Sequence, residues 1–158
     1  ACPVDFVASG MKVYFDSSLY GGYFETEFQL DSRELFRRAK VGWYTVVWSE
    51  VIEREISLAP LQVRNLFELY TRSAASEKIL ITPKVVELAN EYLARRIVPE
   101  RMFNDALHVA LATVYEITYL ASWDDRHLVD PARILGFQIA NVSFGFKPVN
   151  IVTPRQLI

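Results

Sequence analysis

Cysteine is nearly absent from this sequence, because Cys2 is the only one among its 158 residues. A chain with one cysteine forms no intrachain disulfide and no cysteine metal cage, and we expect a reducing, cytoplasmic compartment for it. Histidine is almost as rare, and neither His108 nor His127 stands in a zinc-ligand spacing. No apolar run approaches the roughly 18 residues that a membrane-spanning helix needs, so we expect no membrane partner.

Glycine is also scarce, and none of the six glycines belongs to a phosphate-binding loop. A dinucleotide-binding Rossmann domain needs a glycine-rich turn after its first strand, and a P-loop needs GxxxxGKS or GxxxxGKT; neither pattern is present. A haloacid-dehalogenase phosphatase would have its second aspartate where Ser18 stands. A receiver domain would have a further aspartate in mid-chain, and its Lys-Pro pair would follow a strand, whereas Lys147-Pro148 precedes the last expected strand.

Neither sign of charge dominates, since 17 basic and 19 acidic side chains give a net charge of −2. This balance does not indicate a nucleic-acid-binding protein, although a local basic strip can bind nucleic acid in a protein of this net charge. A hydrophobic content of 51% argues against disorder, and the length is that of one compact domain. We expect residues 11–158 to form that domain, and residues 1–10, before the natural-looking start Met11, to be an added extension.

Strand and helix patterns alternate along the chain. We expect strands at residues 11–15, 45–48, 78–81, 119–123 and 149–152. We expect helices at residues 31–41, from residue 50, from residue 61, and at residues 83–96 and 99–115. Gly21-Gly22 is expected to break the chain, Asp31 to be an N-cap, and residues 124–147 to be irregular. The alternation predicts an α/β fold with three α/β/α layers around a central, mostly parallel sheet.

Two of the expected strands end on an acid beside small hydroxyl residues. Asp16 follows the first strand and precedes Ser17, while Asp124 follows Ser122 after the fourth expected strand. Ligands of open parallel sheets bind outside the carboxyl ends of the strands, so two acids at that edge predict a shared anionic pocket. A single such acid is more often an N-cap or turn residue, and that explanation is harder to hold for two.

Two further acids stand on apolar helix faces. Glu55 falls on the core-facing stripe of the helix after Ser49, and Asp105 lies in a nearly all-apolar helix together with His108. An ionised carboxylate there costs several kcal/mol unless it is paired or binds a metal. The alternative for either acid is a buried salt bridge with an arginine. We expect His108 to be a core histidine and His127 to lie in a loop or at a helix start.

These residues fall into four motifs, which resemble those of the PIN-domain nucleases, particularly the VapC-like toxin ribonucleases and their stand-alone bacterial relatives. The resemblance covers residues 11–158 in the expected order. Its parts are the strand ending at Asp16, the run from Ser49 to Ile56 with Glu55 before an aliphatic residue, the run DALHVALA from Asp105, and the run SWDDRHL from Ser122.

The resemblance implies a metal-dependent endoribonuclease that hydrolyses phosphodiester bonds of single-stranded RNA, as the toxin of a toxin–antitoxin pair. It implies a PIN-like fold, Mg²⁺ or Mn²⁺ as the cofactor, an RNA substrate, a possible antitoxin protein and a homodimer. The catalytic and metal-binding residues would be Asp16, Glu55, Asp105 and Asp124, with Asp125 left open as the fourth acid. Carboxylates suit these hard cations, which activate water for attack on a phosphodiester.

Hydroxyl and basic residues complete the expectations for the site. Ser17 and Ser122 are expected to orient the acids, although both also suit ordinary turns. Arg37, Arg38 and Arg126 are candidates for binding phosphate, although such charges usually form a solvated face. The serious alternative is a catalytically silent PIN-fold module that binds RNA or a protein partner.

Overall fold

A central parallel sheet organises the part of the chain that the computed structural model describes, residues 11–73 and 75–158. The expectation for residues 1–10 lies outside the described residues. The strands within them are β1 (Lys12–Phe15), β2 (Thr45–Ser49), β3 (Ser76–Ile79), β4 (Tyr119–Ala121) and β5 (Ile151–Val152). All neighbouring pairs are parallel, in the order β3-β2-β1-β4-β5. The predicted α/β class and the parallel sheet are therefore confirmed.

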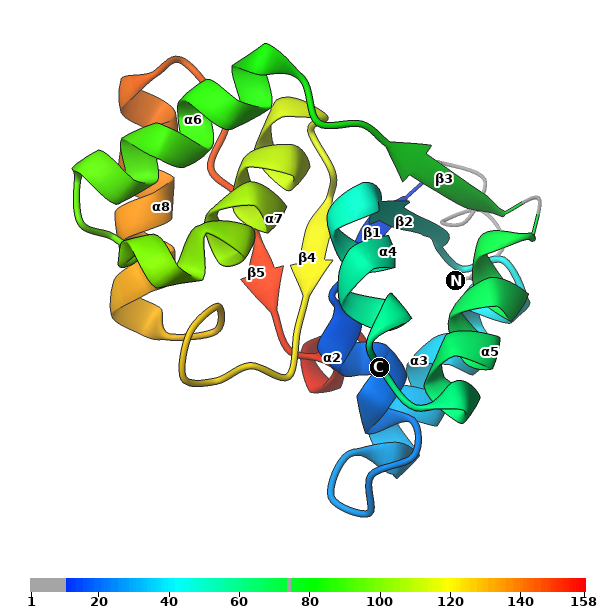
Figure 1. Ribbon diagram of the computed structural model, residues 1–158. Coiled ribbons are helices and arrows are strands. Elements are labelled where there is room, and N and C mark those ends of the chain that lie inside the picture. The colour runs from blue at the N-terminus through cyan, green and yellow to red at the C-terminus, as the bar shows by residue number, and fades with distance from the viewer. Residues whose placement is uncertain (1–10, 74) are drawn as a thin grey trace, which may run out of the picture.

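Helices flank the sheet in two groups. The helices are α2 (Ser17–Gly22), α3 (Gln29–Lys40), α4 (Glu50–Ser57), α5 (Leu61–Thr71), α6 (Pro83–Ala94), α7 (Phe103–Val114) and α8 (Pro131–Ser143), with 3₁₀ turns η1 (Glu100–Met102) and η2 (Pro154–Leu157). One group, α6, α7 and α8, packs together beside β4, while α2 contacts α3 and α5, and α5 contacts β2 and β3 (Figure 1). Between the groups, α4 contacts both α5 and α7, so its side chains reach residues of α7.

The strand order creates a switch point between β1 and β4. The chain runs outward from β1 through β2 to β3 and then returns to place β4 on the other side of β1. The ladder extends past both strands, because the backbone N–H of Asp16 donates to Ala121 at 3.0 Å and that of Ser122 donates to Val152 at 3.0 Å. Ligands of open α/β sheets bind at such a switch point, outside the carboxyl ends of the strands.

Burial explains why these segments adopt their structures. The last three residues of β1 are buried, as expected for a parallel strand covered on both faces. The eight residues Ala106–Thr113 of α7 are all buried, so this helix has no solvent face along that stretch. The predicted start at Thr82-Pro83 is confirmed, because the Thr82 side chain accepts the backbone N–H of Val85 at 3.3 Å.

One helix was not predicted, since α8 occupies much of the segment expected to be irregular, residues 124–147. Its start resembles that of α6, because the Asp130 side chain accepts the backbone N–H of Arg133 at 3.0 Å and Pro131 occupies the first turn. The apolar side chains of α8 are scattered, with Phe137 buried but Leu135 and Ile139 exposed. Because α8 has no single apolar face, the hydrophobic pattern of its sequence did not reveal a helical period.

The segment after β1 also differs from the prediction. Gly21-Gly22 does not break the chain but lies within α2. A side chain at Gly22 would approach the indole of Trp123 to 2.8 Å, so glycine is needed there for close packing. Asp31 is not an N-cap, because α3 begins at Gln29, and its carboxylate instead accepts a hydrogen bond from Arg155 at 2.8 Å.

Other strands and helices begin or end a few residues away from their predicted bounds. The third strand is β3, Ser76–Ile79, rather than residues 78–81, and the helix expected from residue 99 begins as the 3₁₀ turn η1 before α7. Among the described residues, none of the helices has the length and apolar character needed to cross a membrane.

Candidate active site

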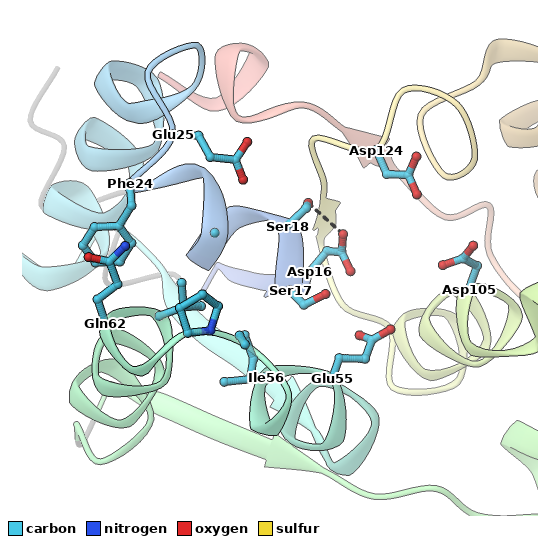
Figure 2. Close-up of a pocket in the computed structure, with 14 residues that line it drawn as sticks. Asp16, Ser17, Ser18, Phe24, Glu25, Glu55, Ile56, Gln62, Asp105 and Asp124 are labelled. Carbon is cyan, nitrogen blue, oxygen red and sulfur yellow. Dashed lines mark hydrogen bonds between the residues drawn. The ribbon is translucent and has the colours of Figure 1, made fainter.

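A cleft of about 550 Å³ opens at the carboxyl edge of the sheet. All four predicted acids line it, and in Figure 2 Asp16, Glu55, Asp105 and Asp124 surround one region of the cleft. They come from four parts of the chain: Asp16 follows β1, Glu55 is on α4, Asp105 is on α7, and Asp124 follows β4. The fold thus brings together the four side chains that the sequence selected.

Asp16 is 5% exposed, and one of its oxygens is fixed by two hydroxyl groups. Ser18 and Ser122 each donate a hydrogen bond of 2.8 Å to Oδ2 of Asp16. The contact expected for Ser17 is therefore made by Ser18, while Ser17 lines the cleft. The other oxygen, Oδ1, lies 3.8 Å from Nε2 of His108. Two donors on one oxygen orient the carboxylate and leave the second oxygen without a serine donor.

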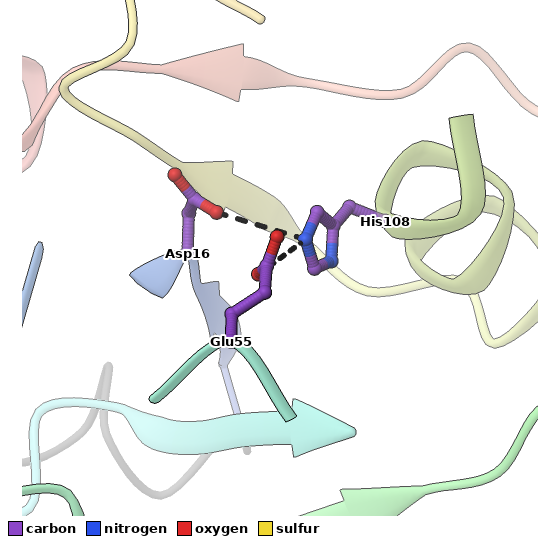
Figure 3. Close-up of side chains that lie close together, drawn as sticks. All are labelled: Asp16, Glu55 and His108. Carbon is purple, nitrogen blue, oxygen red and sulfur yellow. Dashed lines mark hydrogen bonds and ion pairs between the residues drawn. The ribbon is translucent and has the colours of Figure 1, made fainter. Parts of the chain in front are cut away.

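Glu55 is held by His108, which lies on α7 one turn after Asp105. Oε1 of Glu55 lies 2.9 Å from Nε2 of the fully buried imidazole. Figure 3 draws this contact beside Asp16. Because Nε2 faces two carboxylates, we assign the ring hydrogen to this nitrogen. Burial alone would lower the pKa of His108, but its hydrogen bond to Glu55 and the charges of Glu55 and Asp16 raise it overall.

Of the four predicted acids, Asp105 is the one without an ion pair within residues 11–73 and 75–158. Desolvation raises its pKa to about 6; the nearby charge of His108 opposes this shift, while the charges of Asp16 and Asp124 add to it. Carboxylates that crowd together hold protons more tightly than isolated ones. A carboxyl group that is costly to ionise in the metal-free protein is suited to receive a cation.

Asp124 closes a turn as well as lining the cleft. Its Oδ1 accepts backbone N–H groups from Arg126 at 3.3 Å and His127 at 3.1 Å, and its Oδ2 lies 3.1 Å from Nδ1 of His127. Its neighbour Asp125 is exposed and is not among the residues that line the cleft. The geometry therefore favours Asp124 over Asp125 as the fourth acid. Asp124 also stabilises the turn that follows it.

The alternative explanation for these acids, a buried salt bridge with an arginine, does not describe them. Within residues 11–73 and 75–158, the ion pairs of Asp16 and Glu55 are with His108 and that of Asp124 is with His127. No lysine or arginine of these described ranges lies within ion-pair distance of any of the four acids, or lines the cleft.

The candidate phosphate-binding arginines lie in two places. Arg37 and Arg38 are in the last turn of α3, where both pair with Glu34 and Arg38 also donates to the carbonyl of Leu157. This turn leads into the start of β2, at the sheet edge opposite the cleft, and neither arginine lines the cleft. Arg126, by contrast, follows the cleft acid Asp124 by two residues and remains a candidate.

Sequence reasoning missed three residues around the cleft. His108 was expected to be a core residue, and it is buried, but its ring also contacts two of the acids. Its position three residues after Asp105, on the same face of α7, was the available sequence signal. Ser18 stands two residues after Asp16. Glu25 is a fifth acid that lines the far end of the cleft, and no sequence pattern singled it out.

The donor atoms fit a hard divalent cation. One ligand atom each from Asp16, Glu55 and His108 lie within 4.8 Å of one another, and the same is true of Asp105, Asp124 and His127. Carboxylate oxygens dominate both groups, as Mg²⁺ and Mn²⁺ prefer. Oδ1 of Asp16 accepts neither serine hydroxyl and lies 3.8 Å from Nε2 of His108.

Solved structures of other proteins have a similar arrangement of helices and strands. The toxin VapC20 from Mycobacterium tuberculosis, which cleaves the sarcin–ricin loop, superposes with a TM-score of 0.58 at 15% identity, over 76% of this chain and 95% of that one. The chain has the fold of a VapC protein. VapBC2 from Rickettsia felis, solved with a DNA fragment from its promoter, matches with a TM-score of 0.54 at 14% identity, over 90% of this chain and 98% of that one.

These structural matches confirm the VapC-like fold that the four motifs predicted. No protein-family model and no curated protein sequence matches the chain. The low identity means that the VapC fold is what the chain shares with these proteins, and the chemistry has to be argued from its own residues.

Proposed function

We propose that the chain is a metal-dependent endoribonuclease that hydrolyses phosphodiester bonds of single-stranded RNA. The observation that carries this proposal is the meeting of four acids, from four separate parts of the chain, in one cleft at the switch point of the sheet. Buried charges of one sign are costly to gather, and functional sites are where proteins accept that cost.

The residues of the cleft would divide the work. Asp16, Glu55, Asp105 and Asp124 would hold Mg²⁺ or Mn²⁺, which when bound supplies an activated water for in-line attack and offsets charge on the leaving oxygen. Ser18 and Ser122 fix the Asp16 carboxylate for this purpose.

The acids also control access to the cleft. In the metal-free protein the carboxylates, including Glu25, repel a polyanion, since no basic side chain of the described residues lines the cleft. Phosphate groups therefore approach this surface productively only when a cation is held there. This requirement ties RNA binding at the cleft to metal binding.

The likeness in fold supports the choice of RNA, since VapC20 is a toxin that cleaves the sarcin–ricin loop. On the same ground we propose that the chain acts as the toxin of a toxin–antitoxin pair, with an antitoxin protein as its partner. A homodimer, which the resemblance of the motifs implies, is a separate part of the proposal. Arg126, beside the turn of Asp124, is the candidate for contacting the RNA backbone.

Cleavage of a mixed pool of single-stranded RNA tests the activity. We expect cleavage with Mg²⁺ or Mn²⁺, none with EDTA, and none by Asp105→Asn under either condition. The control is Asp125→Asn, which changes an exposed acid beside the cleft and should retain activity. RNA binding without metal-dependent cleavage would contradict the proposal and favour the silent binding module.

A further inference from the structure

A buried chain of hydrogen bonds leads from Glu55 into the interior of the protein. Nε2 of His108 contacts Glu55, and Nδ1 of the same ring lies 2.8 Å from the hydroxyl of Tyr14. That hydroxyl lies 2.7 Å from Oγ of Ser49. Tyr14, Ser49 and His108 have no exposed surface, so the contacts among these three residues are shielded from water, while Glu55 at the end of the chain is partly exposed.

We infer that His108 is a positioning residue that holds Glu55 beside Asp16, and that Tyr14 and Ser49 fix its imidazole ring. The inference deepens the proposed function, on which it rests, because it assigns a role toward the metal site to a residue outside the acid set.

Each member of this chain lies on, or directly beside, an element that presents an acid to the cleft. Tyr14 is two residues before Asp16 and shares its strand face. His108 is three residues after Asp105 on the same face of α7.

Ser49 makes the third link, through the helix that carries Glu55. It caps α4, because its Oγ accepts the backbone N–H of Ile52 at 3.5 Å. The three links therefore fix β1, α4 and α7 relative to one another at the level of the cleft.

The contacts of His108 suit positioning rather than metal ligation once the ring hydrogen is assigned to Nε2, the nitrogen that faces the two carboxylates. With the ring hydrogen on Nε2, the imidazole donates to Glu55, and Nδ1 accepts the hydroxyl hydrogen of Tyr14 in the neutral ring. A metal on Nε2 would require this hydrogen to leave and the contact with Glu55 to break. His108 thus acts on the site through Glu55.

Mn²⁺ binding tests this role independently of catalysis. We expect His108→Leu to weaken Mn²⁺ affinity about 10–100-fold, the usual cost of losing a residue that supports a metal ligand. His108→Gln, whose amide N–H can reach the place of Nε2, should recover most of the affinity. Tyr14→Phe keeps the ring but loses its support, and should weaken binding in the same direction.

The matched control is Tyr92→Phe. Tyr92 is another fully buried tyrosine, and its hydroxyl donates to Asn141 and lies near Thr113, among α6, α7 and α8 and away from the cleft. This variant should lose stability like Tyr14→Phe but bind Mn²⁺ as the parent does. Equal loss of affinity in both tyrosine variants would show a general structural effect and overturn the inference.

Electron paramagnetic resonance of bound Mn²⁺ separates positioning from ligation. We expect the parent and His108→Gln to give the same nitrogen signals at Mn²⁺. A signal from a directly bound nitrogen that is present in the parent and lost in His108→Gln would make His108 a ligand and overturn the inference. Parent protein that binds Mn²⁺ and cleaves RNA, with His108→Leu equal to it in affinity, would overturn the inference alone. Parent protein that binds no Mn²⁺ would overturn the proposed function, and this inference with it.

Discussion

Ser122, the residue after β4, donates a hydrogen bond of 2.8 Å to Oδ2 of Asp16, the residue after β1. Two residues 106 positions apart in sequence are thereby joined at the centre of the sheet edge. The same Ser122 hydroxyl oxygen accepts the backbone N–H of Asp124 at 3.0 Å, so one side chain connects two of the four acids.

Removing this hydroxyl should weaken metal binding without unfolding the protein. We expect Ser122→Ala to lower Mn²⁺ affinity by about 10–100-fold, because Asp16 loses one of its two orienting donors. Calorimetric titration with Mn²⁺ measures the change. Ser17→Ala is the comparison, since Ser17 also lines the cleft but Ser18 takes its expected contact. A larger effect at Ser17 would reverse these roles.

Metal binding should raise the stability of the protein. A ligand present at 100 times its dissociation constant raises the free energy of unfolding by about 2.7 kcal/mol, provided that it binds only the folded state. We therefore expect Mn²⁺ to raise the melting temperature of the parent and to leave that of Asp16→Asn nearly unchanged. An equal rise in both proteins would place the bound ion outside the cleft.

Asp105→Asn should melt no lower than the parent in EDTA, while its nuclease activity is lost. The raised pKa of Asp105, at about 6, means that the folded state resists ionising this group, mainly because it is desolvated. The substitution keeps the shape of the side chain and removes that cost. Breaking a buried ion pair would instead cost about 3–5 kcal/mol. A clearly lower melting temperature with retained activity would make Asp105 a structural residue.

The same comparison should depend on pH in a defined direction. Between the unfolded pKa of aspartate, about 4, and the folded value of about 6, the folded state binds more protons, so its stability falls as pH rises. Above about pH 6 the penalty is complete, and below about pH 4 it is absent. The advantage of Asp105→Asn over the EDTA-treated parent should therefore grow across this window in paired thermal melts. An advantage that shrinks with rising pH would contradict the assignment.

Gly22 should not tolerate a side chain. A Cβ there would lie 2.8 Å from two atoms of Trp123 and 2.9 Å from Oγ of Ser32, so Gly22→Ala should lower the free energy of unfolding by about 1–3 kcal/mol. The neighbouring Gly21→Ala meets only the far end of the Glu25 side chain at 3.3 Å and should be neutral or slightly stabilising. Denaturant unfolding of both variants compares them, and equal losses would contradict close packing as the reason.

The sequence predicted the positions of those residues whose neighbours identify either an apolar helix face or the end of a strand at the sheet edge. Asp16 follows an apolar run, and the carboxyl ends of parallel strands share one edge, so its position followed from the strand pattern. Glu55 was selected because it falls on the apolar stripe of an amphipathic helix. For α8 no such stripe exists, since Leu135 and Ile139 are exposed and Phe137 is buried, and the helix was missed.

The role of His108 could not be predicted, because a sequence pattern does not show which residues of other elements surround a side chain. A histidine in an almost wholly apolar helix is compatible with a packed core and with a site, because such a helix has no distinct face. Only the positions of Tyr14 and Glu55, from two other elements, decide between the two. Ser18 was overlooked for a similar reason, since its neighbour Ser17 has the same chemistry and only the turn into α2 sets their directions.

Helix α7 joins the cleft to a buried part of the protein. Its residues Ala106–Thr113 are buried on every side, and Asp105 and His108 project from it toward the other acids. Amides in such a segment exchange their hydrogens with solvent mainly when the whole domain opens. The backbone that carries His108 should therefore be displaced only when the domain unfolds, whereas substitutions of the side chains around the cleft can change metal binding in the folded protein.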